Sequence, residues 1–159
     1  FQKEFDNYEL EPHLIRQVMK RWYLIAGDSA TNPPTIKTFG LERIIKIEKT
    51  QNAYQPQTKE IKKRIRKVYG ISQYNEDKEV VVLETNRWQG KYLETLPIHP
   101  SQQVEYLLND MCRISLSIVI NKELIQLLAS QPHAIKVIKP ERLKTEYRQF
   151  LETKLSPLE

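Results

Sequence analysis

Two cations that share a side with apolar residues are the first candidates for chemistry in this sequence. Alternate residues of a β-strand point to the same face of the sheet. If residues 35–47 form one strand, Lys37 and Arg43 therefore lie on the same face as four apolar residues. These apolar residues are Phe39, Leu41, Ile45 and Ile47. Burying an unpaired charge costs several kcal/mol. Three interpretations remain open: the strand breaks near Gly40, Glu42 and a neighbour neutralise the cations, or the cations line an anion-binding pocket.

The histidines, the cysteine and the serines offer little for catalysis. His13, His99 and His133 stand in no HExxH or HxH spacing, and Cys112 is the only cysteine, so we expect no metal site and no cofactor. Ser101 follows His99 by two residues, but no GxSxG sequence surrounds it. A turn that enters a strand is the favoured interpretation there, and a hydrolase is a distant alternative. We expect the chain not to be an enzyme.

The positive charge of the chain is concentrated in one segment. The net charge is +5, and residues 51–70 hold six basic side chains against one acidic side chain. Apolar residues recur there at i, i+4 and i+7, namely Ile61, Ile65 and Val68. This spacing predicts an amphipathic helix over 57–69, ended by Gly70, with a basic outer face. The face is either a solvated surface or a contact for an anionic partner, and in the second case Lys62 and Arg66 are candidate binding residues.

The elements that would position these residues fall into two groups. The first fifty residues predict short strands without a long helix, which favours a small, strongly bent sheet or barrel. The expected strands are 13–18, 21–26, 35–41 and 43–48.

From about residue 79 onward, strands and helices alternate. The expected strands are 79–85, 103–108, 113–120 and 134–138, and the expected helices are 86–96, 122–130 and a last one that begins at Pro140. Asn121 is expected to cap the helix over 122–130. Without the last helix the order is βαββαβ, the ferredoxin-like pattern of a four-stranded antiparallel sheet with helices on one face. A domain boundary is expected near residue 75.

Composition also bears on the compartment. The longest strongly apolar run, 114–120, is far shorter than the roughly 20 residues that cross a bilayer, so no membrane span is expected. A single cysteine fits a reducing compartment, and we expect a cytoplasmic protein. Residue 1 is Phe rather than Met and no leader follows it, so we expect a fragment that has lost upstream sequence.

Several motifs resemble one known family. RWYLIA at 21–26, followed by KTFGLERI at 37–44, resembles the WYL domain, which carries a Trp-Tyr-Leu strand and then a strand of the form (R/K)TF-x-L-(D/E)-R-I. LPIHPSQ at 96–102 and VIKPERL at 137–143 resemble the C-terminal extension of WYL proteins. The resemblance covers nearly the whole chain.

The resemblance implies a mixed α and β fold in three parts. These parts are an Sm-like, SH3-type small β-barrel (WYL) at 1–55, a basic connecting helix and linker at 56–75, and a ferredoxin-like extension at 76–159. It also implies a ligand-sensing and oligomerisation module of a bacterial transcriptional regulator, with a homodimer expected. In such regulators promoter DNA is read by an N-terminal helix-turn-helix, which this chain lacks.

The ligand that the resemblance implies is single-stranded nucleic acid or a nucleotide-like anionic effector. Its family binding surface maps to Arg21, Trp22, Tyr23, Lys37, Phe39 and Arg43 of this sequence. Joined with the basic helix, the predicted effector site consists of Arg21, Tyr23, Lys37, Arg43, Lys62 and Arg66. Trp22 and Leu24 share a parity, and we expect them in the barrel core together with Phe39. The alternative function is a protein–protein interaction or dimerisation module without a small ligand. The sequence leaves open the identity of the ligand, the regulated genes and the choice between activation and repression.

Overall fold

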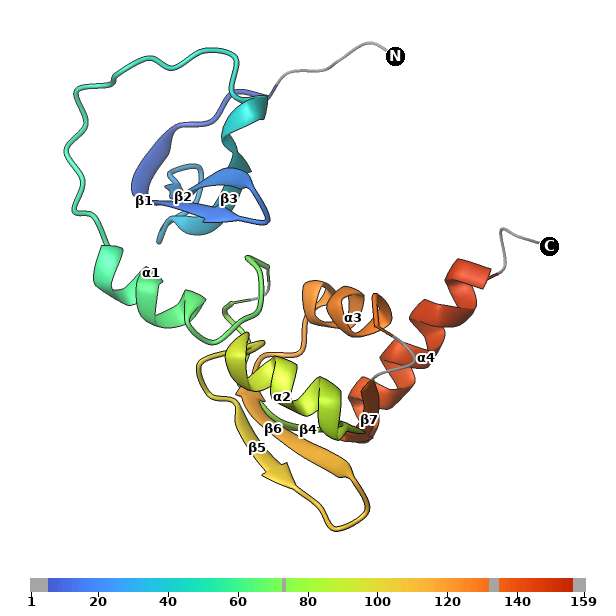
Figure 1. The fold of residues 1–159 in the computed structure, drawn as a ribbon. Helices are drawn as coiled ribbons and strands as arrows, with labels where there is room; N and C mark the ends of the chain where they lie inside the picture. Colours follow the sequence, from blue (N-terminus) through green and yellow to red (C-terminus); the bar gives the residue numbers. More distant parts are fainter. Residues whose placement is uncertain (1–5, 73, 132–134, 156–159) are drawn as a thin grey trace. The chain divides into compact units, whose positions relative to one another are not determined.

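The chain has a mixed α/β fold with two antiparallel sheets. The computed structural model describes residues 6–72, 74–131 and 135–155, so His133 and Ala134 lie outside the described residues. Within them it has four α-helices (Figure 1). The chain divides into two compact units, Phe1–Lys63 (unit 1) and Arg64–Glu159 (unit 2).

Unit 1 contains a three-stranded antiparallel sheet in the order β1-β2-β3. Its strands are β1 (Leu10–Val18), β2 (Arg21–Asp28) and β3 (Thr35–Gly40). Met19 and Lys20 join β1 to β2, and both have positive φ, 47° and 67°. A two-residue turn with two left-handed residues matches the twist of an antiparallel pair, which explains the tight hairpin.

The strand predicted at 43–48 is wrong, and the period-two pattern ends at Gly40. A 3-10 turn, η1 (Leu41–Arg43), follows β3, and residues 44–50 have no strand assignment. Ile45 and Ile47 are 70% and 82% exposed, so the apolar side of the predicted strand is not buried. Of the three open interpretations, a break near Gly40 is therefore the one that the structure shows.

The basic segment forms a shorter helix than its apolar spacing predicts. The helix α1 (Thr58–Ile65) buries Ile61 and Ile65 and exposes Lys62. The chain then turns, and Val68 forms a parallel bridge with Val119 instead of a further helical turn. The expectation that Arg66 lies on the helix is therefore wrong.

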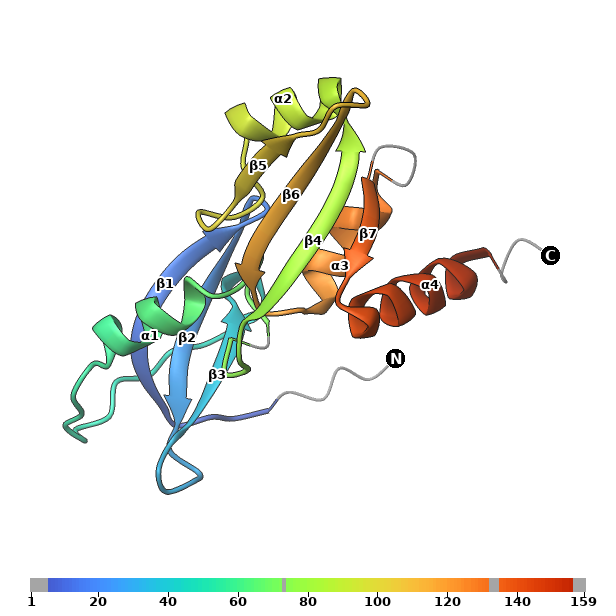
Figure 2. The same cartoon turned by 90° about the horizontal axis from the view of Figure 1, so that it is seen from below.

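Unit 2 contains a four-stranded antiparallel sheet in the order β5-β6-β4-β7 (Figure 2). Its strands are β4 (Glu79–Asn86), β5 (Gln103–Tyr106), β6 (Met111–Ile118) and β7 (Ile135–Lys139). Its helices are α2 (Arg87–Thr95), α3 (Lys122–Ala129) and α4 (Glu141–Leu155). The predicted order of strands and helices from residue 79 onward is confirmed.

The core of unit 2 lies on one face of this sheet. The burial of β6 alternates strictly, with Ile114 and Leu116 buried and Ser115 half-buried on the other side. The residues that share the core face are Val81, Leu83, Ile114, Leu116, Ile118, Ile135 and Val137 from the sheet, with Leu93, Leu124, Ile125, Leu128 and Leu143 from the three helices. All three helices therefore contribute apolar side chains to the same core.

Asparagine caps fix where two of these helices begin. The Asn121 side chain accepts the backbone N–H of Leu124 at 2.9 Å, as predicted, and the Asn86 side chain accepts that of Gln89 at 2.8 Å. Gly90 lets α2 approach the sheet closely, because a Cβ there would lie 2.4 Å from Sγ of Cys112. None of the helices in the described residues is long and apolar enough to span a bilayer.

Candidate functional site

Strand register sorts the predicted site residues onto the two faces of the unit 1 sheet. Arg16 lies opposite Tyr23, and Tyr23 lies opposite Gly40, so Arg16, Arg21 and Tyr23 share one face, here called the arginine face. Leu24 lies opposite Phe39, and Ala26 lies opposite Lys37. Trp22, Leu24, Lys37 and Phe39 therefore share the other face, here called the tryptophan face.

The tryptophan face is open at the hairpin end. Trp22 is 50% exposed and Ile15 is 55% exposed, so the expectation of a buried Trp22 is wrong. Leu24 and Phe39 are half-buried. Complete burial is found further along β2, at Ala26 on this face and at Ile25 on the arginine face. Trp22 is thus available to an external partner.

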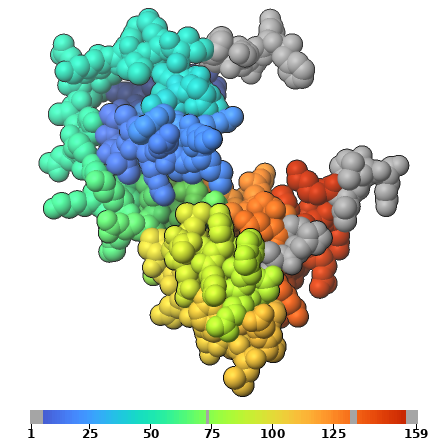
Figure 3. Space-filling model, viewed as in Figure 1, coloured from blue at the N-terminus to red at the C-terminus, as the bar shows by residue number. Residues whose placement is uncertain are grey.

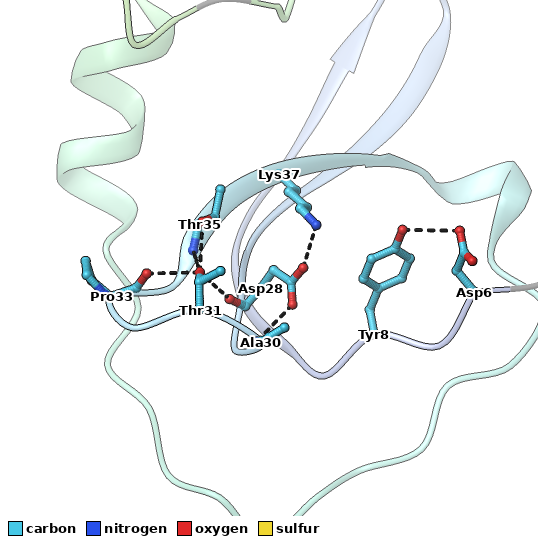
Figure 4. Close-up of polar contacts among 8 residues, drawn as sticks. All are labelled: Asp6, Tyr8, Asp28, Ala30, Thr31, Pro33, Thr35 and Lys37. Atoms are coloured by element: carbon cyan, nitrogen blue, oxygen red, sulfur yellow. Dashed lines mark hydrogen bonds and ion pairs between the residues drawn. The ribbon is translucent and has the colours of Figure 1, made fainter.

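Lys37 is neutralised by a carboxylate that the sequence analysis did not connect with it. Its Nζ donates to Oδ2 of Asp28 at 2.6 Å, and Oδ1 of the same carboxylate accepts the Ala30 N–H at 3.0 Å (Figure 4). The side chain of Asp28 is 5% exposed. The hydrogen bond between the two side chains lowers the pKa of Asp28 and raises the pKa of Lys37. Lys37 therefore has a partner of opposite charge before any ligand arrives.

The loop after β2 and an aromatic ring hold this ion pair in place. The Thr31 hydroxyl accepts the Thr35 N–H at 2.8 Å and lies within hydrogen-bonding distance of the carbonyl oxygens of Asp28 and Pro33, 3.3 and 3.0 Å away (Figure 4). The Tyr8 ring centroid lies 5.1 Å from Nζ of Lys37. This arrangement fixes Lys37 as part of the framework of unit 1.

Two of the predicted site residues are exposed arginines, Arg21 on the arginine face and Arg43 in the turn after β3. Arg21 is 65% exposed and lies 3.8 Å from a carboxylate oxygen of Glu42, a contact of little strength at that exposure. Arg43 is exposed at the end of η1, and within the described residues no carboxylate lies within 4 Å of it. Tyr23 is half-buried. Arg21 and Tyr23 thus lie on the arginine face, and Arg43 is a second exposed cation, in the turn that follows β3.

The remaining two predicted residues stand apart from this cluster. Lys62 is exposed on α1 in unit 1. Arg66 is exposed beyond the end of α1 and belongs to unit 2. Each of them is available to a partner at its own place on the chain.

Arg16 is the residue that the sequence reasoning missed. It is half-buried, and its Nη1 atom is buried without a hydrogen-bond partner. Burial lowers the pKa of Arg16. The available signal was its position on the predicted strand 13–18, where Arg16 shares a parity with the apolar Leu14 and Val18, as Lys37 does with its apolar neighbours in 35–47.

His99 and Ser101 lie together but serve the backbone of unit 2. Nε2 of His99 donates to the Arg66 carbonyl at 2.7 Å, and Nδ1 accepts the Ser101 N–H at 3.1 Å. The Ser101 hydroxyl accepts the Ser117 N–H at 2.9 Å and lies 3.1 Å from the Ser117 carbonyl. These bonds continue the pairing along β6 and fasten the turn after α1. The geometry is that of a structural clamp.

Comparisons with known proteins give little guidance. No protein-family description matches the chain, and no curated protein is similar to it. Among solved structures, Proteasome accessory factor B/C (PafBC) of Arthrobacter aurescens is similar at 15% sequence identity and a TM-score of 0.43, over 94% of this chain and 22% of that chain. The chain thus spans about a fifth of the length of that structure. A TM-score at this level carries no argument about fold or function.

Proposed function

We propose that the chain is the sensing and oligomerisation module of a bacterial transcriptional regulator of the WYL type. The two motifs that resemble the WYL domain lie on β2 and β3, which are paired antiparallel neighbours in one sheet. The order β5-β6-β4-β7 with the chain order βαββαβ is consistent with a ferredoxin-like extension. In this proposal unit 1 is a small Sm-like unit that binds the effector.

The observation that carries the proposal is the arginine face. Arg21 and Arg43 are exposed guanidinium groups without a strong internal partner, and Tyr23 lies on the same face as Arg21. A guanidinium group can bind two oxygens of one phosphate at once, and an aromatic ring can stack on a base. The ligand class that fits is single-stranded nucleic acid or a nucleotide-like anionic effector.

Fluorescence polarisation with a labelled 15-nucleotide single strand tests this proposal. If about four phosphates are contacted, the logarithm of the affinity should fall with the logarithm of salt at a slope of roughly −3. The double variant Arg21→Glu/Arg43→Glu should lose roughly a hundredfold in affinity, since two attractive charges become repulsive. The matched control is Lys122→Glu, an exposed charge reversal at the start of α3. Binding that ignores salt, or a double variant with unchanged affinity, contradicts the proposal.

Regulation follows if the effector distinguishes two arrangements of a homodimer. A ligand shifts such an equilibrium only by the difference in its affinity for the two states. The shift would then reposition the DNA-reading domain that the resemblance implies upstream. Sedimentation of the protein with and without the oligonucleotide should show this change, and an identical sedimentation profile speaks against it.

A second function, self-assembly without a small ligand, is favoured by the outer side of α2. Trp88 is 74% exposed and Leu96 is 61% exposed, and the Trp88 ring stacks on Tyr92 at 6.5 Å between centroids. Figure 3 shows α2 at the surface of unit 2. Exposed apolar clusters of this kind mark interaction surfaces, and the partner proposed here is a second copy of the chain. A dimer that Trp88→Ala dissociates, and that retains no oligonucleotide at low salt, would favour this function over the first.

A further inference from the structure

Two buried donor atoms of β1 lack an acceptor. Among the buried side-chain nitrogen and oxygen atoms of the described residues, Nε2 of His13 and Nη1 of Arg16 have no hydrogen-bond partner. Buried polar atoms nearly always have a hydrogen-bond partner, because nothing offsets the desolvation free energy of an unpaired donor. The two atoms differ in what surrounds them, and this difference decides which of them points to a ligand.

His13 has an acid beside it. Burial lowers the pKa of His13, and the charge of Glu11 opposes that shift. A Cβ on Gly27 would lie 3.3 Å from Nε2 of His13 and 3.6 Å from a carboxylate oxygen of Glu11, so both groups face the same small space. His13 Nδ1 also accepts the Gln57 N–H at 3.4 Å. A small movement of Glu11 would satisfy His13 from within the chain.

Arg16 has no such neighbour. Among the described residues no carboxylate lies within ion-pair distance of it, and burial alone lowers its pKa, with no charged group contributing. A guanidinium stays protonated at every pH at which the protein works, so it cannot escape the cost of burial by losing its charge. The Arg16 side chain is only half-buried, so part of it remains exposed to solvent and to a ligand. An oxyanion from outside the chain would supply both an acceptor for Nη1 and a charge opposite to that of the guanidinium.

We propose that the guanidinium of Arg16 is the recessed anchor of the effector site on the arginine face. Tyr23 lies directly opposite it in the sheet, and Arg21 lies two residues before Tyr23 on the same face. An oxyanion bound to Arg16 would thus share this face with Arg21, whose side chain is 65% exposed. The inference rests on the proposed function, in which the oxyanion is a phosphate of the effector. The same chemistry would accept a carboxylate.

Two variants of Arg16 separate a binding role from a structural one. Arg16→Met keeps an apolar stem but removes the unpaired charge, and Arg16→Lys keeps the charge but loses the planar fork. Binding is measured with the 15-nucleotide single strand and, in parallel, with a poly-aspartate peptide of equal charge. The matched control is Lys49→Met, which removes an exposed cation of unit 1.

The expected result is a loss of affinity without a loss of stability. Arg16→Met should bind the oligonucleotide roughly ten- to hundredfold more weakly, and Arg16→Lys should lie between it and the wild type. The thermal midpoint of unit 1 in Arg16→Met should stay the same or rise, because no partner is lost. Lys49→Met should bind within about twofold of the wild type. If the wild-type chain binds the peptide as well as the oligonucleotide, Arg16 anchors a general oxyanion site. If the wild-type chain binds the oligonucleotide alone, Arg16 anchors a phosphate site.

Other outcomes overturn the inference and separate it from the proposed function. If Arg16→Met unfolds more easily and the folded Arg16→Lys binds like the wild type, Arg16 is structural. If both variants bind like the wild type, the anchor is absent while the sensor function stands. If the wild-type chain binds neither probe, the sensor function fails, and the anchor fails with it.

Discussion

The two units differ in how completely they satisfy their buried groups. The continuous hydrophobic core lies entirely in unit 2, whereas Ile25, Ala26 and Ile61 are the fully buried apolar residues described in unit 1. In unit 2 the buried Gln89, His99 and Asn121 all have hydrogen-bond partners, and the two unpaired buried donors belong to unit 1. We therefore expect unit 2 to be the more stable unit, whereas the buried donors without a hydrogen-bond partner lie in unit 1.

The largest effect should come from the core of unit 2. Ile114→Ala removes a fully buried side chain from the central strand β6 and should cost roughly 3–4 kcal/mol of unfolding free energy. The chain has two tryptophans, one in each unit. Denaturant unfolding followed by Trp88 fluorescence, in a Trp22→Phe background, measures this loss.

The same experiment can contradict the contrast between the units. In a Trp88→Phe background the Trp22 signal should keep its midpoint, because the deleted side chain belongs to the core of the other unit. Equal shifts of both signals would show that the two units unfold as one.

A smaller effect is expected from the structural clamp in unit 2. Ser101→Ala leaves the Ser117 N–H without its acceptor and should cost about 1–2 kcal/mol, in the range for an unsatisfied buried donor. Trp88 fluorescence reports the loss. Preserved stability together with loss of a hydrolytic activity would instead revive the hydrolase alternative.

The smallest effect should be a mild acid sensitivity confined to unit 1. The pKa of His13 lies below its ordinary value of 6.5, so the unfolded chain binds the proton more readily than the folded one. His13 therefore contributes stability above pH 6.5, and this contribution is lost as the pH falls through its folded pKa.

A pH series read at each tryptophan measures this effect. The midpoint of the Trp22 signal should fall below pH 6.5, and His13→Gln should remove that part of the fall. The Trp88 signal of the same samples is the control. An unchanged pH profile in His13→Gln would assign the acid sensitivity to other groups.

The element order of unit 2 could be predicted because its signals are local. The apolar residues of β6, the Asn121 cap and Pro140 before α4 are signals that act within a few residues, and the strand, the cap and the last helix are all present. Unit 1 could not be predicted in the same way. The end of β3 at Gly40 depends on the η1 turn. In unit 2, the end of α1 also escapes local prediction, because the chain after it forms a bridge between Val68 and the distant Val119.

Which residues of unit 1 share a face could be predicted only within one strand. Parity placed Trp22 and Leu24 on one side, which the register of the sheet confirms. The partner of Lys37 lies nine residues earlier, across a hairpin, so counting within its own strand could not find Asp28. The position of Arg16 among apolar residues could be read from the sequence, but its lack of a partner depends on the folded surroundings.

The single thiol of the chain has a practical consequence for measuring distances with attached dyes. Cys112 is fully buried, and burial raises the pKa of its thiol, so it should react slowly with maleimide reagents. The natural sequence can then serve as a nearly cysteine-free background. A cysteine introduced at exposed Ile47 and another at exposed Leu108 would carry a donor and an acceptor dye, and energy transfer between them would report whether an effector changes the distance between the units.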